Sequence, residues 1–150
     1  MLRLPVDPAD NSLTKVTDEL LRPNGLAFSA DESLLYVSDT GQSHAPDWPD
    51  QIRVFDMVTG RTLTQGRVFA DVDCGLPDGF RLDVWGNIWT SAGENVNVYS
   101  PGGALLGRIK LGSKTSNVVF GGPDGTTLFI TSSAYVYAIE VAVTGQRRPG

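Results

Sequence analysis

The sequence has few of the features that mark the more specialised classes of protein. Its 150 residues include one cysteine and one histidine, and 12 lysines plus arginines stand against 17 aspartates plus glutamates, a formal net charge of −5. A single cysteine excludes an internal disulfide framework and a zinc site built from cysteines. The negative charge and the lack of a Lys/Arg cluster argue against binding along a nucleic-acid backbone.

Long hydrophobic runs are also missing. The apolar runs are only a few residues long, too short to span a membrane, and residues 1–5 lack the apolar core of a signal peptide. We therefore expect a cytoplasmic location, with a targeting segment in an upstream half of the protein left open. The contents of 41% hydrophobic and 19% charged residues are ordinary for one folded domain.

Regular apolar spacing of the helical kind is absent from the chain as well. Short runs of β-branched and aromatic residues recur instead, separated by turn clusters rich in Gly, Pro, Asn and Asp. This pattern predicts an all-β fold. The predicted strands are Gly25–Phe28, Leu34–Ser38, Ile52–Asp56, Thr62–Phe69, Phe80–Asp83, Asn87–Thr90, Val96–Ser100, Leu105–Leu111, Asn117–Phe120, Leu128–Thr131 and Val136–Val141.

Three segments align as internal repeats: Arg22–Phe28 (RPNGLAF), Leu76–Leu82 (LPDGFRL) and Thr115–Phe120 (TSNVVF). A second and a third predicted strand follow each segment, and a fourth completes the first two repeats. Four strands in about 40 to 50 residues are the unit of a β-propeller blade. An insertion at Thr40–Asp50 accounts for most of the extra length of the first repeat.

The repeats predict about three blades of four-stranded antiparallel sheet. The division is the end of a preceding blade (1–21, with strands at Met1–Val6 and Leu13–Leu20), a blade (22–75), a second blade (76–114) and an incomplete last blade (115–145). Propellers close with four to eight blades, so one copy of this chain does not close a ring.

The repeats also carry a family resemblance. Residues 22–39 (RPNGLAFSADESLLYVSD), 77–83 (PDGFRLD), 86–93 (GNIWTSAG) and 117–122 (NVVFGG) resemble the gluconolactonase–regucalcin (senescence marker protein) family of six-bladed propellers. The chain corresponds to roughly the C-terminal half of a family member. The resemblance implies a hydrolase of sugar lactones that uses a divalent metal ion, Ca²⁺ or Zn²⁺, with Mg²⁺ and Mn²⁺ as further options.

Two residues match the metal ligands of that family. The resemblance implies Asn24 and Asp78 as ligands and Asp78 also as the general base. Amide and carboxylate oxygens suit Ca²⁺ and Mg²⁺, and a bound cation polarises a carbonyl and acidifies a water. Both residues stand at the start of an innermost strand, so we expect them side by side in the channel. A further Glu ligand and the substrate-contacting Arg/Asn segment of the family have no counterpart here.

Simpler interpretations stand beside these assignments. Asn-Gly and Pro-Asp-Gly are common turn sequences, so Asn24 and Asp78 could serve only as turn residues. Asn117 occupies the third equivalent position and is either a substrate-binding residue in the channel or a cap of its inner strand. Arg81 and Asp83 alternate with apolar neighbours and are expected on the blade surface. Trp85 and Trp89 are expected between blades.

The sequence is thus compatible with two main functions, of which only one is enzymatic. One is a metal-dependent lactonase, in which a metal-activated water attacks the lactone carbonyl. The other is a catalytically incomplete propeller fragment or binding module that lacks the Glu ligand. A third hypothesis is another six-bladed hydrolase or a strictosidine-synthase-like protein. A small lactone is the expected partner, nucleic acid and membrane are not, and a homodimer of two three-bladed copies would complete six blades.

Overall fold

The computed structural model describes residues 13–146, and this part of the chain is built from β-strands with one short 3₁₀ turn, η1 (Gly41–Ser43). Every strand in the predicted list is confirmed within a few residues of its expected ends. The strands are β1 (Pro23–Phe28), β2 (Leu34–Thr40), β3 (Asp50–Val58), β4 (Thr62–Asp71), β5 (Phe80–Leu82), β6 (Ile88–Ala92), β7 (Asn95–Tyr99), β8 (Leu105–Lys110), β9 (Thr115–Gly121), β10 (Thr127–Ser132) and β11 (Tyr135–Glu140).

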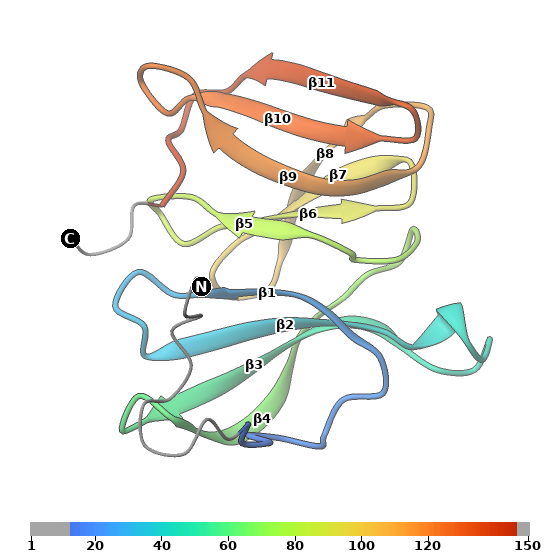
Figure 1. The fold of residues 1–150 in the computed structure, drawn as a ribbon. Coiled ribbons are helices and arrows are strands. Elements are labelled where there is room, and N and C mark those ends of the chain that lie inside the picture. Colours follow the sequence, from blue (N-terminus) through green and yellow to red (C-terminus); the bar gives the residue numbers. More distant parts are fainter. Residues whose placement is uncertain (1–12, 147–150) are drawn as a thin grey trace, which may run out of the picture.

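The strands form three antiparallel sheets that stack as propeller blades (Figure 1). The sheet orders are β1-β2-β3-β4, β5-β6-β7-β8 and β9-β10-β11, so the third sheet has three strands. The first strand of each sheet lies innermost: β1 contacts β5, and β5 contacts β9. We call the β1–β5 contact the first seam and the β5–β9 contact the second seam.

Alternating strand residues fill the space between the sheets with apolar side chains. Ile52, Phe80 and Ile88 are completely buried between the first two sheets, and Val96 and Leu128 are completely buried between the second and third. Burial of such side chains is the main favourable term in folding, so each sheet depends on its neighbour.

Only one of the two tryptophans expected between blades lies there. Trp89 meets Phe120 of β9 edge-to-face, with ring centroids 5.6 Å apart. Trp85, in the turn after β5, is 69% exposed, and that expectation is wrong. The alternation that governs a strand ends with the strand, so it does not place a residue in the following turn.

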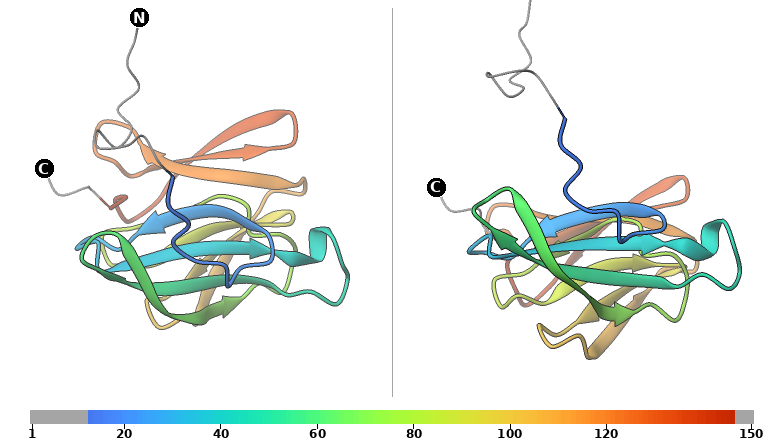
Figure 2. Two further views of the ribbon diagram at one scale, coloured as in Figure 1. Left: turned by 60° about the horizontal axis from the view of Figure 1, so that its bottom comes forward. Right: turned by 90° about the horizontal axis from the view of Figure 1, so that it is seen from below.

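The strand expected at Leu13–Leu20 does not form, and that prediction is wrong: the segment has no regular secondary structure. Its start projects away from the sheets, and its end turns along the first sheet (Figure 2). There Leu20 packs against the side-chain cluster around Phe55, and Glu19 pairs with Arg53 at 3.0 Å. A strand needs a hydrogen-bonding neighbour, and this segment is attached through side chains instead. The strand expected at Met1–Val6 lies outside the described residues.

Within residues 13–146, no helix is both long and apolar enough to cross a membrane.

Candidate functional site

The starts of β1 and β5 bring Asn24 and Asp78 into contact at one end of the inner strands. Asn24 Nδ2 donates a hydrogen bond of 2.9 Å to Asp78 Oδ1, across 54 positions in sequence. Gly25 permits this approach, because a Cβ at that position would overlap the carbonyl oxygen of Asp78. The two residues therefore lie side by side, as their places in the repeat predict.

Burial and neighbouring charges raise the pKa of two carboxyl groups at this end of the inner strands. Burial raises the pKa of the half-buried Asp78. The pKa of Asp50, at the start of β3, is raised first by burial and further by the charges of Asp39 and Asp78, against a hydrogen bond from the Gln42 backbone. The negative charges of Asp39 and Asp78 thus act on Asp50, and a negative field of this kind favours a cation.

The donor set of the pair agrees in kind with an oxygen-ligated cation. Among the described residues, Asn24 Oδ1 and Asp78 Oδ2 accept no hydrogen bond, so two oxygens are available to a ligand. Calcium takes roughly six to eight oxygen ligands. Residues 13–146 hold no cluster of three or more His, Cys, Asp or Glu side chains that could bind a metal. The pair therefore supplies part of a coordination shell.

Asn117, at the start of β9, is close to the pair in the fold but makes no hydrogen bond with it. Its side chain lies against Gly79, and its Oδ1 accepts the N–H of Val118 at 2.9 Å. Together with Arg81 and Val136 it also lines a hollow of about 330 Å³ on the third sheet. The hydrogen bond of Asn117 agrees with its role as a cap of its own strand. Its role in binding substrate stays a prediction.

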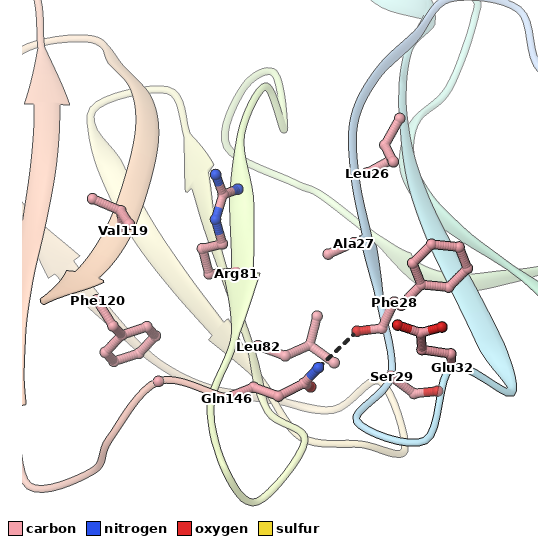
Figure 3. Close-up of a pocket in the computed structure, with 11 residues that line it drawn as sticks. Leu26, Ala27, Phe28, Ser29, Glu32, Arg81, Leu82, Val119, Phe120 and Gln146 are labelled. Atoms are coloured by element: carbon pink, nitrogen blue, oxygen red, sulfur yellow. Dashed lines mark hydrogen bonds between the residues drawn. The ribbon is translucent and has the colours of Figure 1, made fainter. Parts of the chain in front are cut away.

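A larger hollow, of about 450 Å³, opens at the opposite ends of the inner strands (Figure 3). Phe28, Leu82 and Phe120 surround it, and Gln146 closes one side by donating from Nε2 to the carbonyl oxygen of Phe28 at 3.2 Å. None of Asn24, Asp78 and Asn117 lines it. This hollow is therefore separate from the candidate site.

Asp83 departs from its expected place on the blade surface and is only 1% exposed. Its carboxylate accepts hydrogen bonds from the backbone of Trp85 and Asn87, the Asn87 amide and Trp89 Nε1. A buried carboxylate needs such partners, and here it fixes the turn that follows β5. Arg81 is exposed, as expected.

Two buried serines, Ser38 and Ser91, are site residues that sequence reasoning missed. Each lies near the end of the second strand of its sheet, Ser38 in β2 and Ser91 in β6. Ser38 Oγ accepts the N–H of Gly25, next to Asn24, and Ser91 Oγ accepts the N–H of Asp78. The only signal in the sequence is the recurrence of a serine at or near the end of that strand in each of the three repeats.

Comparison with known proteins identifies the family. A family model described as the SMP-30/Gluconolactonase/LRE-like region matches residues 3–134. The chain belongs to this family. The gluconolactonase of Zymomonas mobilis is 36% identical over 141 residues, which are 91% of this chain and 39% of that protein. Regucalcin of Xenopus laevis is 31% identical over 129 residues, 83% of this chain and 42% of that protein.

Solved structures of the family show the same propeller blades. A gluconolactonase of Xanthomonas campestris superposes with a TM-score of 0.75 and 39% identity, over 89% of this chain and 42% of that one. A calcium-binding regucalcin of Agrobacterium tumefaciens shares the fold, with a TM-score of 0.72 and 22% identity over 93% of this chain and 52% of that one. The chain thus spans about half, or less, of the length of these relatives.

Proposed function

We propose that this chain supplies Asn24 and Asp78 to the cation site of a sugar-lactone hydrolase. The observation that carries the proposal is the contact between these two side chains at the first seam. Relatives that cover most of this chain are named as gluconolactonases, including a 6-deoxy-6-sulfogluconolactonase of Pseudomonas putida, 36% identical over 83% of this chain and 43% of that protein. A small sugar lactone is accordingly the substrate class that we propose.

Asn24 Oδ1 and Asp78 Oδ2 would hold the divalent cation, Ca²⁺ or Zn²⁺ first and Mg²⁺ or Mn²⁺ as alternatives. When bound, such a cation polarises a carbonyl oxygen and lowers the pKa of a water. A regucalcin relative is described as calcium-binding, which supports a divalent cation without fixing its identity.

Asp78 is the general base in this proposal. The Asn24 amide fixes its Oδ1, and burial raises its pKa toward the range in which a carboxylate accepts a proton well. Asp78 takes a proton from water as the water oxygen bonds to the lactone carbonyl carbon. The ring C–O bond then breaks, the ring oxygen receives the proton as a hydroxyl, and the product is the open-chain acid.

The alternative is a catalytically incomplete propeller fragment or binding module. The lack of a cluster of three or more His, Cys, Asp or Glu side chains within residues 13–146 favours it, because Asn24 and Asp78 alone supply only part of the six to eight oxygens that Ca²⁺ takes. A second copy could supply it, since two copies of three blades would complete the ring, and a dimer in native mass spectrometry is the outcome expected of that arrangement. A cytoplasmic location remains a prediction; one structural neighbour, from Pseudomonas aeruginosa, is a periplasmic gluconolactonase.

Hydrolysis of D-glucono-δ-lactone, corrected for the spontaneous reaction, separates these functions. The lactonase predicts turnover that is lost on chelation and in Asp78→Ala. Cation binding without turnover favours the binding module. Turnover that survives both chelation and Asp78→Ala contradicts the proposed site.

A further inference from the structure

Ser38, near the end of β2, joins the backbone on both sides of the first seam. The residue is completely buried. Its Oγ accepts the N–H of Gly25, the neighbour of Asn24, at 2.7 Å. The same oxygen lies 3.1 Å from the carbonyl oxygen of Asp78 and 3.3 Å from that of Gly25, and its proton can be donated to either.

Ser91, near the end of β6, repeats this arrangement one blade further on. It too is completely buried, and its Oγ accepts the N–H groups of Asp78 at 3.0 Å and Gly79 at 3.2 Å. It lies 3.4 Å from the carbonyl oxygen of Ser116 in the third sheet, at the limit of a hydrogen bond. The backbone next to each candidate cation ligand is therefore held by a buried serine, at Gly25 beside Asn24 in β1 and at Asp78 itself just before β5.

The two seams depend on their serines to different degrees. At the second seam Gly79 N–H also donates directly to the Ser116 carbonyl, at 2.9 Å. Among the described residues, no backbone-to-backbone hydrogen bond joins β1 to β5. Ser38 is thus the described residue through which the backbones at Asn24 and Asp78 are tied to each other.

We propose that Ser38 is a positioning residue that sets the separation and orientation of the Asn24 amide and the Asp78 carboxylate. Its role as a support for cation binding rests on the proposed function; its role in holding the backbone at Gly25 against the backbone at Asp78 does not. Ser38 hydrogen-bonds the backbone of Gly25, the neighbour of Asn24, and the backbone of Asp78, and no described hydrogen bond joins it to the Asn24 or Asp78 side chain. It therefore acts through the backbone and is not itself a ligand.

The first readout is amide hydrogen exchange, followed by NMR on the full chain. In Ser38→Ala the Gly25 N–H loses its acceptor, and we expect its exchange to accelerate on the order of tenfold. Ser132→Ala is the matched control, because Ser132 is equally buried and donates to the Ser113 carbonyl in the third sheet, away from the pair. We expect the exchange rate of the Gly25 N–H in Ser132→Ala to equal that of wild type.

The second readout is the affinity for Ca²⁺ alone, measured by calorimetry on the same samples. We expect an affinity on the order of tenfold weaker in Ser38→Ala and unchanged in Ser132→Ala. Ser38→Cys, whose sulfur is a larger and weaker hydrogen-bond acceptor than the hydroxyl oxygen, is expected between wild type and Ser38→Ala, and it serves where Ser38→Ala does not fold.

The two measurements test separate claims. A wild-type chain that binds no Ca²⁺ contradicts the proposed cation site in this chain, while Gly25 exchange still decides whether Ser38 holds the seam. Unchanged exchange at Gly25 in both Ser38 variants, or equal acceleration in Ser132→Ala, overturns the positioning role.

Discussion

The two seams between the inner strands are built differently, although both begin from the same repeat. The first seam is joined by side chains: Asn24 bonds Asp78, and Ser38 bridges the two backbones. The second is joined by backbone as well, through the bond from Gly79 to Ser116, and Asn117 turns its oxygen to its own strand. Side-chain oxygens therefore remain available at the first seam, which is where a ligand can bind.

The largest expected effect comes from adding a methyl group at each seam. In Gly25→Ala the new Cβ overlaps a backbone oxygen of Asp78, which cannot move away without opening the first seam. We expect a loss of about 2–4 kcal/mol in the free energy of unfolding. In Gly79→Ala the new Cβ lies closest to the Asn117 side chain, which can move, and 2.9 Å from the Ser116 carbonyl oxygen, so the expected loss is smaller. Chemical denaturation measures both.

Gly107→Ala is the control for this pair. A Cβ at Gly107, in β8, meets nothing within 4 Å, and its backbone is not left-handed, so the free energy of unfolding should stay within about 0.5 kcal/mol of wild type. Equal losses at Gly25 and Gly107 would show that the tight approach at the first seam is not what the glycine serves.

A smaller change in the free energy of unfolding is expected from neutralising Asp78. Because its pKa is raised in the folded state, its contribution to stability is present below the unfolded pKa of 3.8 and is lost as pH rises through the folded pKa. Asp78→Asn, whose amide oxygen can still accept from Asn24, should therefore stabilise the cation-free protein at pH 7 and have little effect at pH 3. Thermal melts at the two pH values measure this.

Neutralising Asp31 is expected to change the stability at pH 7 in the opposite direction, so Asp31 is the matched carboxylate control. Hydrogen bonds from Ser29 and Ser33 lower its pKa to about 2, so its contribution is present above pH 3.8 and is lost as pH falls toward 2. Asp31→Asn should therefore destabilise the protein at pH 7. The same sign of change in both variants would contradict the assigned cause at Asp78.

The smallest effect is expected at the second seam, from Asn117→Ala. The variant removes the acceptor for the Val118 N–H, a loss of about 0.5–1.5 kcal/mol in the free energy of unfolding. It leaves the Asn24–Asp78 contact intact, so Ca²⁺ affinity should change less than twofold. A tenfold loss would move Asn117 into the cation site.

The strands and the meeting of Asn24 with Asp78 could be predicted from the sequence, because the blade repeat sets both. The buried polar groups could not. Asp83 reads as a surface position by alternation, yet it follows the last residue of β5 and its partners lie in the next turn and strand. Ser38 reads as an ordinary strand residue, because its partners belong to the inner strands of two sheets. Leu13–Leu20 has strand-like residues but no neighbouring strand to pair with.

The most direct test is calorimetric titration of Ca²⁺ into the wild-type chain and into Asn24→Ala, Asp78→Ala and Asn117→Ala. Our account predicts binding in the wild type and in Asn117→Ala, with affinity at least about tenfold weaker in the other two, equivalent to about 1.4 kcal/mol or more. One affinity shared by all four proteins would contradict the claim that Asn24 and Asp78 form the cation site of this chain.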